Sequence, residues 1–180
     1  NIWEEEHSSK RRVCMLMITH ACNLKCSYCY ETHKQNAYMT IDLAKDIILK
    51  EAKMIEKSDQ FDEIQIDFMG GEPLMNFSLI KDVVEWLESG AINVPWVCFA
   101  STNATLINKD IRAWLKEHKK YMILGISYDG TSRMQSKNRG TDQYDIDLDF
   151  FHELWPEQTF QMTISKETLP FLAEGVLSVQ

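Results

Sequence analysis

Three cysteines, Cys22, Cys26 and Cys29, form a C-x3-C-x2-C pattern directly after the apolar run 13–18. Thiolates at this spacing on one loop can face a single point, and such soft ligands select zinc, copper(I) or iron–sulfur clusters. A 4Fe–4S cluster is normally held by four thiolates. Three local cysteines would therefore leave one iron open to a substrate or a cofactor.

A structural zinc site is the alternative for the same three cysteines. Such sites are closed and usually have four ligands, and His20 and His33 flank the loop as possible fourth ligands. Either histidine could instead hydrogen-bond near a cluster. The other two cysteines, Cys14 and Cys98, lie inside apolar runs, where free cysteine is commonly buried as a small hydrophobe.

Length and composition predict a single domain with a sizeable core, because the chain has 180 residues of which 44% are hydrophobic. The formal net charge of −8 argues against a general nucleic-acid surface, which is normally basic. Neither a membrane-spanning run nor a secretory apolar segment is visible. The charge and the lack of a spanning run lead us to expect neither a nucleic-acid nor a membrane partner. Five cysteines are an odd number for a disulfide framework, so we expect the protein to reside in the reducing cytoplasm.

Strand and helix patterns alternate along the chain. Strands are predicted at 13–19, 63–69, 94–100, 121–127 and 158–165, and helices at 40–57, 77–88, 108–118, 146–154 and 169–178. Such alternation indicates βαβ units with a parallel sheet and right-handed crossovers. A complete eight-stranded barrel takes about 250 residues, so the chain predicts an α/β fold, a partial (β/α) TIM-type barrel of about five units.

Local signals support several of these elements. Thr40 and Asn108 are suitable N-caps for the first and third helices, and Pro170 falls in the first turn of the last helix, where proline is tolerated. The first strand, 13–19, is a continuous apolar run. Runs of this kind are typical of strands that are buried on both faces, and that is the expectation for this one.

Polar motifs follow each of the first four predicted strands. The cysteine loop follows the first, Gly70-Gly71-Glu72 the second, Ser101-Thr102-Asn103 the third, and Ser127-Tyr128-Asp129-Gly130 the fourth. In parallel α/β folds ligands bind at the carboxyl ends of the strands, so one site can collect all four motifs. The two glycines would let the backbone approach a ligand closely, although on their own they also fit an ordinary turn.

These motifs together resemble those of the radical S-adenosylmethionine (SAM) enzymes. The family signature is C-x3-C-x-aromatic-C, in which Tyr28 supplies the aromatic residue. The resemblance implies that the three cysteines bind a 4Fe–4S cluster whose open iron chelates SAM. An electron from the cluster then cleaves SAM, and the resulting 5′-deoxyadenosyl radical takes hydrogen from the substrate.

The resemblance also implies contacts to SAM. Glu72 of the family's G-G-E segment, with Gly70 and Gly71, would bind the SAM amino group, and Asn103 and Tyr28 belong to the same cofactor site. Two further residues come from the family's S-x-D-G-x8-R segment. In it, Ser127 would lie near the ribose and Arg139 would pair with the SAM carboxylate, for which a planar guanidinium is suited.

The chain departs from the family pattern at two places. The family commonly has T-N-G after the third strand, whereas this chain has Ala104 in the glycine position. Alanine resists a positive φ, so the local backbone is expected to differ. The family often has His-Asp where this chain has Gln135-Ser136, and no role is carried over to those two residues.

The motifs are similar to those of the branch that modifies peptides and proteins, which includes sulfatase-maturing enzymes and maturases of ribosomally made peptides. The resemblance implies a peptide or protein substrate and an electron donor such as a flavodoxin or ferredoxin. Members carry a cysteine-rich C-terminal SPASM or twitch domain, but no cysteine follows Cys98. We therefore expect a lead-in at 1–11 and a C-terminally truncated core at 12–180, which lacks the family's sixth unit.

Two alternatives to an active enzyme core stay open from the sequence. One is a non-catalytic zinc-binding interaction module, and the other is a catalytically incomplete fragment. The substrate, the residue that exchanges hydrogen with it and the oligomeric state are not assigned.

Overall fold

The computed structural model describes all residues except 1–9, 32–33, 141–145, 158–159 and 179–180. Its centre is a five-stranded sheet in the order β1-β2-β3-β4-β5, with each neighbouring pair parallel. The strands are β1 (Arg11–Thr19), β2 (Glu63–Gly70), β3 (Trp96–Thr102), β4 (Met122–Ser127) and β5 (Phe160–Gln161). The predicted fold, a partial barrel of parallel strands and alternating helices, is confirmed.

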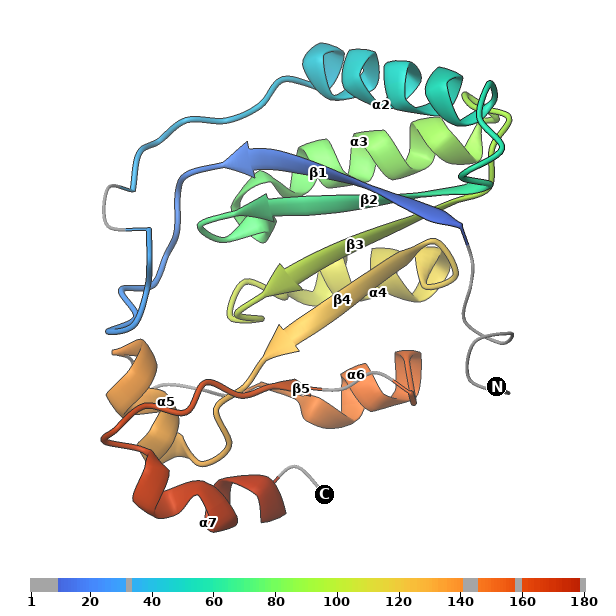
Figure 1. Ribbon diagram of the computed structural model, residues 1–180. Helices are drawn as coiled ribbons and strands as arrows, with labels where there is room; N and C mark the ends of the chain where they lie inside the picture. The colour runs from blue at the N-terminus through green and yellow to red at the C-terminus, as the bar shows by residue number, and fades with distance from the viewer. Residues whose placement is uncertain (1–9, 32–33, 141–145, 158–159, 179–180) are drawn as a thin grey trace.

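Helices follow the strands in sequence, and several of them cover one face of the sheet. They are α2 (Ile41–Ile55), α3 (Phe77–Glu88), α4 (Lys109–His118), α5 (Ser132–Arg139), α6 (Leu148–Leu154) and α7 (Leu172–Leu177), with short 3-10 helices η1 (Pro73–Asn76) and η2 (Leu169–Phe171). Figure 1 shows α3 and α4 behind the strands and α2 above β1, with the opposite face of the strands turned toward the viewer. The apolar stripes of these helices and the inward side chains of the strands form one core.

The predicted N-caps are present. The Thr40 hydroxyl accepts a hydrogen bond from the Leu43 amide, and the Asn108 side chain accepts from the Asp110 and Ile111 amides. These bonds satisfy donors that have no partner inside the helix. Pro170 lies in the first turn of η2, and the predicted helix 169–178 is divided between η2 and α7.

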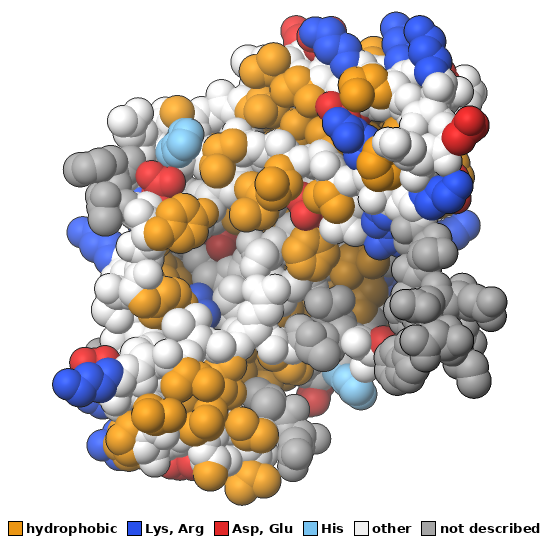
Figure 2. Space-filling model, in the orientation of Figure 1, with side chains coloured by type: hydrophobic (Ala, Val, Ile, Leu, Met, Phe, Trp, Pro, Cys, Tyr) orange, Lys and Arg blue, Asp and Glu red, His pale blue; other side chains and the backbone are white. Residues whose placement is uncertain are grey.

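The prediction that the first strand is buried on both faces is wrong. Leu16 and Ile18 are buried, but Met15 on the other face is 70% exposed and Val13 is 51% exposed. The reason is that β1 lies at the edge of the sheet and only one face is covered by helices. Figure 2 shows hydrophobic side chains over β1 on this open face, beside a hollow near the carboxyl ends of the strands.

Helix α5 was not predicted from the sequence. Its segment, SRMQSKNR, is polar, yet Met134, Gln135, Asn138 and Arg139 are all buried. The helix begins after the Thr131 cap and ends at Gly140, whose φ of 67° is left-handed, as is common for glycine just past a helix. None of the helices in the described part of the chain has the length and apolar character needed to cross a membrane.

Candidate cofactor site

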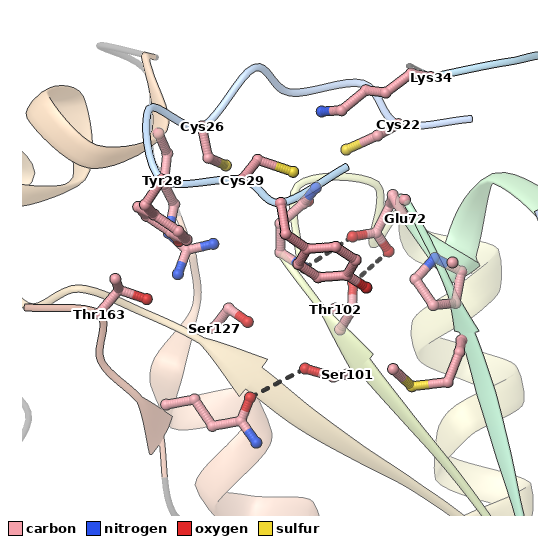
Figure 3. A pocket seen from close by; sticks show the side chains of 18 of the residues that line it. Cys22, Cys26, Tyr28, Cys29, Lys34, Glu72, Ser101, Thr102, Ser127 and Thr163 are labelled. Carbon is pink, nitrogen blue, oxygen red and sulfur yellow. Dashed lines mark hydrogen bonds between the residues drawn. The ribbon is translucent and has the colours of Figure 1, made fainter. Parts of the chain in front are cut away.

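The residues that the sequence placed in one site line a single cavity of about 290 Å³ at the carboxyl ends of the strands. They come from the loop after β1, from the ends of β2, β3 and β4, and from α5. Figure 3 shows the cysteine loop above this cavity and the strand ends below it. The predicted residues that line it are Cys22, Cys26, Tyr28, Cys29, Gly70, Gly71, Glu72, Asn103, Ser127 and Arg139.

The three cysteines of the loop are free thiols that face the same space. In Figure 3 the sulfur atoms of Cys22 and Cys29 are turned toward each other, with that of Cys26 beside Cys29. The Leu24 amide donates to the Cys22 sulfur at 3.4 Å. Burial raises the pKa of the Cys26 thiol, and the nearby cations of Arg139 and Lys34 oppose that rise.

Gly70 and Gly71 allow the chain after β1 to lie against the end of β2. A Cβ at Gly70 would lie 2.3 Å from the Thr19 carbonyl oxygen, and one at Gly71 would lie 2.5 Å from the Ala21 oxygen and 2.9 Å from Cys22 Cβ. The Gly71 amide donates to the Thr19 oxygen at 3.2 Å. The two glycines therefore determine the position of Cys22 at the start of the loop, independently of any contact that they make with a ligand.

Glu72 is almost fully buried and accepts hydrogen bonds from its own chain. Its Oε1 accepts from the Thr102 hydroxyl at 2.6 Å and the Leu74 amide at 3.1 Å, and its Oε2 accepts from the Asn103 amide at 2.8 Å. Burial raises the pKa of Glu72, while these three donors act in the opposite direction. The carboxylate thus joins the end of β2 to the end of β3, and it also borders the cavity.

Asn103 connects the end of β3 to the cysteine loop. Its Nδ2 donates to Asn23 Oδ1 at 3.0 Å, and its Oδ1 accepts from the Thr105 amide and hydroxyl. The expectation that Ala104 avoids a positive φ is wrong, since its φ is 61°. The Ala104 amide donates to Thr102 Oγ1 at 3.0 Å, and this network holds the turn that glycine would adopt more readily.

Arg139 is buried and forms an ion pair inside the chain. Its Nε lies 2.8 Å from Asp129 Oδ2 and its Nη2 lies 3.0 Å from Asp129 Oδ1. Gln135, at one of the two departures from the family pattern, accepts from Arg139 Nε and from the Asp129 amide, both at 3.1 Å. The predicted pairing of Arg139 with the SAM carboxylate stays a prediction.

Tyr28 lies between Arg139 and Thr163, a residue of the segment that follows β5. The Arg139 guanidinium lies 5.6 Å from the centre of the Tyr28 ring. Burial raises the pKa of Tyr28 to about 12, and a hydrogen bond with Thr163 opposes that rise. The aromatic residue of the cysteine motif therefore fixes the loop against the far side of the cavity.

Comparison with known proteins identifies the family. Residues 11–146 match the 4Fe-4S single cluster domain, which is most of the chain. The chain belongs to this family. Its resemblance to radical SAM enzymes, predicted from the motifs, is confirmed.

Three curated relatives of this 4Fe–4S domain illustrate its range. An uncharacterised protein of Methanocaldococcus jannaschii is 39% identical over 64% of this chain and 38% of its own length. The radical SAM cyclopropyl synthase TigE of Paramaledivibacter caminithermalis is 28% identical over 76% of this chain and 31% of its own. The Fe-coproporphyrin III synthase of Methanosarcina barkeri is 33% identical over 73% and 30%. The chain thus spans about a third of the length of these relatives.

Among solved structures, the fold is similar to that of anSMEcpe with bound AdoMet and the Cp18Cys peptide. The TM-score is 0.72 at 19% identity, and the similarity covers 93% of this chain and 46% of that one. At this identity the likeness shows the fold alone. It agrees with the partial barrel that the strand order gives.

The donor set of the 4Fe–4S domain fits a cluster with one open iron. Three thiols from one short loop border one cavity, and soft sulfur ligands suit iron–sulfur clusters. Within the described ranges, no three His, Cys, Asp or Glu side chains converge as ligands of a single metal ion. Of the two histidines considered for zinc, His20 Nδ1 lies 3.9 Å from Glu31 Oε2, and His33 lies outside the described residues.

Several cavity residues were missed by the sequence reasoning. Lys34 lines the cavity and donates a hydrogen bond to the Leu24 carbonyl inside the cysteine loop. Gln161 and Thr163 reach the cavity from β5 and the segment after it, and Gln161 Oε1 accepts from the Ser101 hydroxyl at 3.1 Å. No motif marks these residues. For Gln161 and Thr163 the one available signal was their position in the fifth predicted strand, 158–165.

Proposed function

We propose that this chain is the core of a radical SAM enzyme that modifies a peptide or protein. Cys22, Cys26 and Cys29 would hold a 4Fe–4S cluster at the mouth of the cavity, and SAM would occupy the space beneath it. When bound, the cluster supplies the electron that cleaves SAM to the 5′-deoxyadenosyl radical, which takes hydrogen from the substrate. The electron would come from a flavodoxin or ferredoxin in the cytoplasm.

One observation carries this proposal: three thiols share one cavity with Gly70-Gly71-Glu72 and Ser127, which come from separate strand ends. Backbone groups at the two glycines would receive the amino acid part of SAM, and Ser127 would lie near its ribose. Tyr28 and Asn103 would stabilise the sides of the SAM cavity, because Tyr28 contacts Arg139 of α5 and Asn103 bonds to Asn23 of the cysteine loop. The protein's own task is to orient SAM and to exclude water from it.

A peptide substrate is supported by the sequence motifs and by the name of the structural neighbour, which holds a peptide. A second substrate class has support too, because one relative is named as a synthase of Fe-coproporphyrin. Deuterium transfer separates the two. A radical SAM enzyme that acts on a peptide should move deuterium from a deuterated peptide into 5′-deoxyadenosine, and no transfer from any peptide would contradict the peptide assignment.

Anaerobic reconstitution with iron and sulfide tests the core of the proposal. The protein should turn brown, and the electron paramagnetic resonance signal of the reduced cluster should change when SAM is added. Replacement of Cys22, Cys26 or Cys29 by alanine should abolish the colour, whereas Cys14→Ala should keep it. A colourless protein that binds one zinc ion per chain would favour the interaction module instead.

A further inference from the structure

We propose that Asp129, Asn138 and Arg139 form a latch that positions the cysteine loop, with Arg139 acting on the loop and not on the SAM carboxylate. The proposal rests on the proposed function, because it concerns the same cofactor site. The contacts that support it join α5, which follows β4, to the cysteine loop, which follows β1 at the far edge of the sheet.

The first part of the latch is the Asp129–Arg139 ion pair. Asp129 is 0% exposed and Arg139 is 5% exposed, and two guanidinium nitrogens reach the two carboxylate oxygens at 2.8 and 3.0 Å. This is the bidentate geometry in which arginine binds carboxylates most strongly. Turning these two guanidinium nitrogens away from Asp129 to meet a ligand would leave the buried carboxylate without its cation, which is strongly unfavourable.

The second part is Asn138, which contacts both the ion pair and the cysteine loop. Its Nδ2 donates to Asp129 Oδ2 at 3.3 Å and to the Thr163 carbonyl at 2.8 Å. Its own carbonyl oxygen accepts from the Ser27 amide at 2.8 Å and from the Ser27 hydroxyl at 3.2 Å. Ser27 lies between Cys26 and Cys29, so this carbonyl sets the backbone from which both thiols project.

The third part is the stacking of Arg139 on Tyr28, which directly precedes Cys29. Asp129 Oδ1 also accepts from the Thr163 amide at 2.8 Å, so the segment that follows β5 holds the ion pair as well. Figure 1 shows the chain descending from the tip of β1 to α5 before it returns to α2. The loop is therefore fixed at its far end by α5 and at its near end by β1 and β2.

Hydrogen exchange of the cluster-free protein tests the latch without any cofactor. The Ser27 amide should exchange slowly in the wild type and at least tenfold faster in Arg139→Gln and Asp129→Asn. Lys137→Gln removes an exposed cation from the same helix and should leave the exchange unchanged. Asn138→Ala leaves no buried charge unpaired, so it keeps the test valid if the charge variants do not fold, and it too should speed exchange.

Ligand binding to the reconstituted protein separates positioning from direct contact. S-adenosylhomocysteine has the carboxylate that 5′-methylthioadenosine lacks. If Arg139 positions the loop, Arg139→Gln should weaken both ligands by the same factor. A selective loss of S-adenosylhomocysteine, or rapid exchange of Ser27 in the wild type, would overturn the latch. If the wild type binds neither cluster nor ligand, the proposed function is contradicted, whereas the hydrogen-exchange experiment still tests the latch on its own.

Discussion

Glu72 shows how one side chain can serve the frame of a site as well as its ligand. Its two carboxylate oxygens accept from Thr102, Leu74 and Asn103. In Glu72→Gln an NH2 group would face at least one of these backbone amides, which would lose its acceptor. An unsatisfied buried donor costs about 1–3 kcal/mol, so we expect the variant to lose that much stability in urea unfolding of the cluster-free protein.

Glu117→Gln is the matched control, because Glu117 is exposed on α4. It should change the free energy of unfolding by less than about 0.5 kcal/mol. Equal stability of Glu72→Gln and the wild type would mean that Glu72 is free to serve a ligand alone. The amino-group role that the resemblance implies would then gain weight over the structural one.

At the scale of residues, the sequence was informative where spacing defines the chemistry. The cysteine pattern, the glycine pair and the serine and arginine of the fourth unit all border one cavity. The sequence was silent on which polar groups neighbour one another. Nothing in the order of residues indicates that Arg139 meets Asp129, or that Asn138 meets Ser27, because the packing of α5 against the loop decides both.

Gly71 tests how the strand ends position the cysteine loop. A methyl group at Gly71 would meet the Ala21 carbonyl and Cys22 Cβ, so Gly71→Ala must push the start of the loop away from β2. We expect the variant to keep its fold but to bind less iron per chain on reconstitution, by a factor of two or more by analogy with shifted metal ligands. Iron analysis and visible absorption measure the loss.

Gly90→Asn is the control for a glycine outside the site. Gly90 has a φ of 85° with no atom near its added Cβ, and asparagine tolerates this conformation better than most residues. Iron binding should be unchanged. If Gly71→Ala also keeps its full iron content, close approach at β2 does not set the position of Cys22.

The start of α6 provides a pH test at the scale of an element. The Asp147 side chain accepts from the Phe150 amide at 3.1 Å and pairs with Arg112 at 2.5 Å. The hydrogen bond from Arg112 is the main cause that holds the pKa of Asp147 below its usual 3.8. Loss of an N-cap costs about 1 kcal/mol, so Asp147→Ala should destabilise the protein by about that amount near neutral pH.

The sign of the pH dependence follows from the lowered pKa. The folded state holds the Asp147 proton less tightly than the unfolded chain, so the stabilisation is present above the usual 3.8 and is lost as the pH falls through the lower folded value. The stability difference between Asp147→Ala and the wild type should shrink below pH 4. A difference that stays constant down to pH 2 would show that the charge plays no part.

Elements with clear periodicity were predictable, and those with ambiguous composition were not. The stripes of α2 and α3 recur at helical spacing, and the predicted N-caps Thr40 and Asn108 lie at the starts of α2 and α4. Helix α5 has few apolar residues, so its buried face is polar and leaves no stripe to detect. The burial of β1 was misjudged because an apolar run does not indicate whether a second layer covers the strand.

For the molecule as a whole, the cysteine loop joins elements that the sheet alone does not hold together. It is tied to β2 at Gly71, to the end of β3 through Asn23 and Asn103, and to α5 through Ser27. These contacts come from opposite ends of the strand order. A ligand that binds all three thiols should therefore stabilise the loop together with its contacts to the ends of β1 and β2 and to α5.

Removal of the cluster tests this coupling. A ligand that binds only the folded chain stabilises it by about 2.7 kcal/mol at 100 times its dissociation constant. Reconstituted protein should thus unfold at a higher urea concentration than the same protein after chelation of iron, and hydrogen exchange should slow in α5 as well as in the loop. Cys22→Ala should show no difference between the two treatments. Protection confined to residues 22–29 would show that the loop and α5 are not coupled.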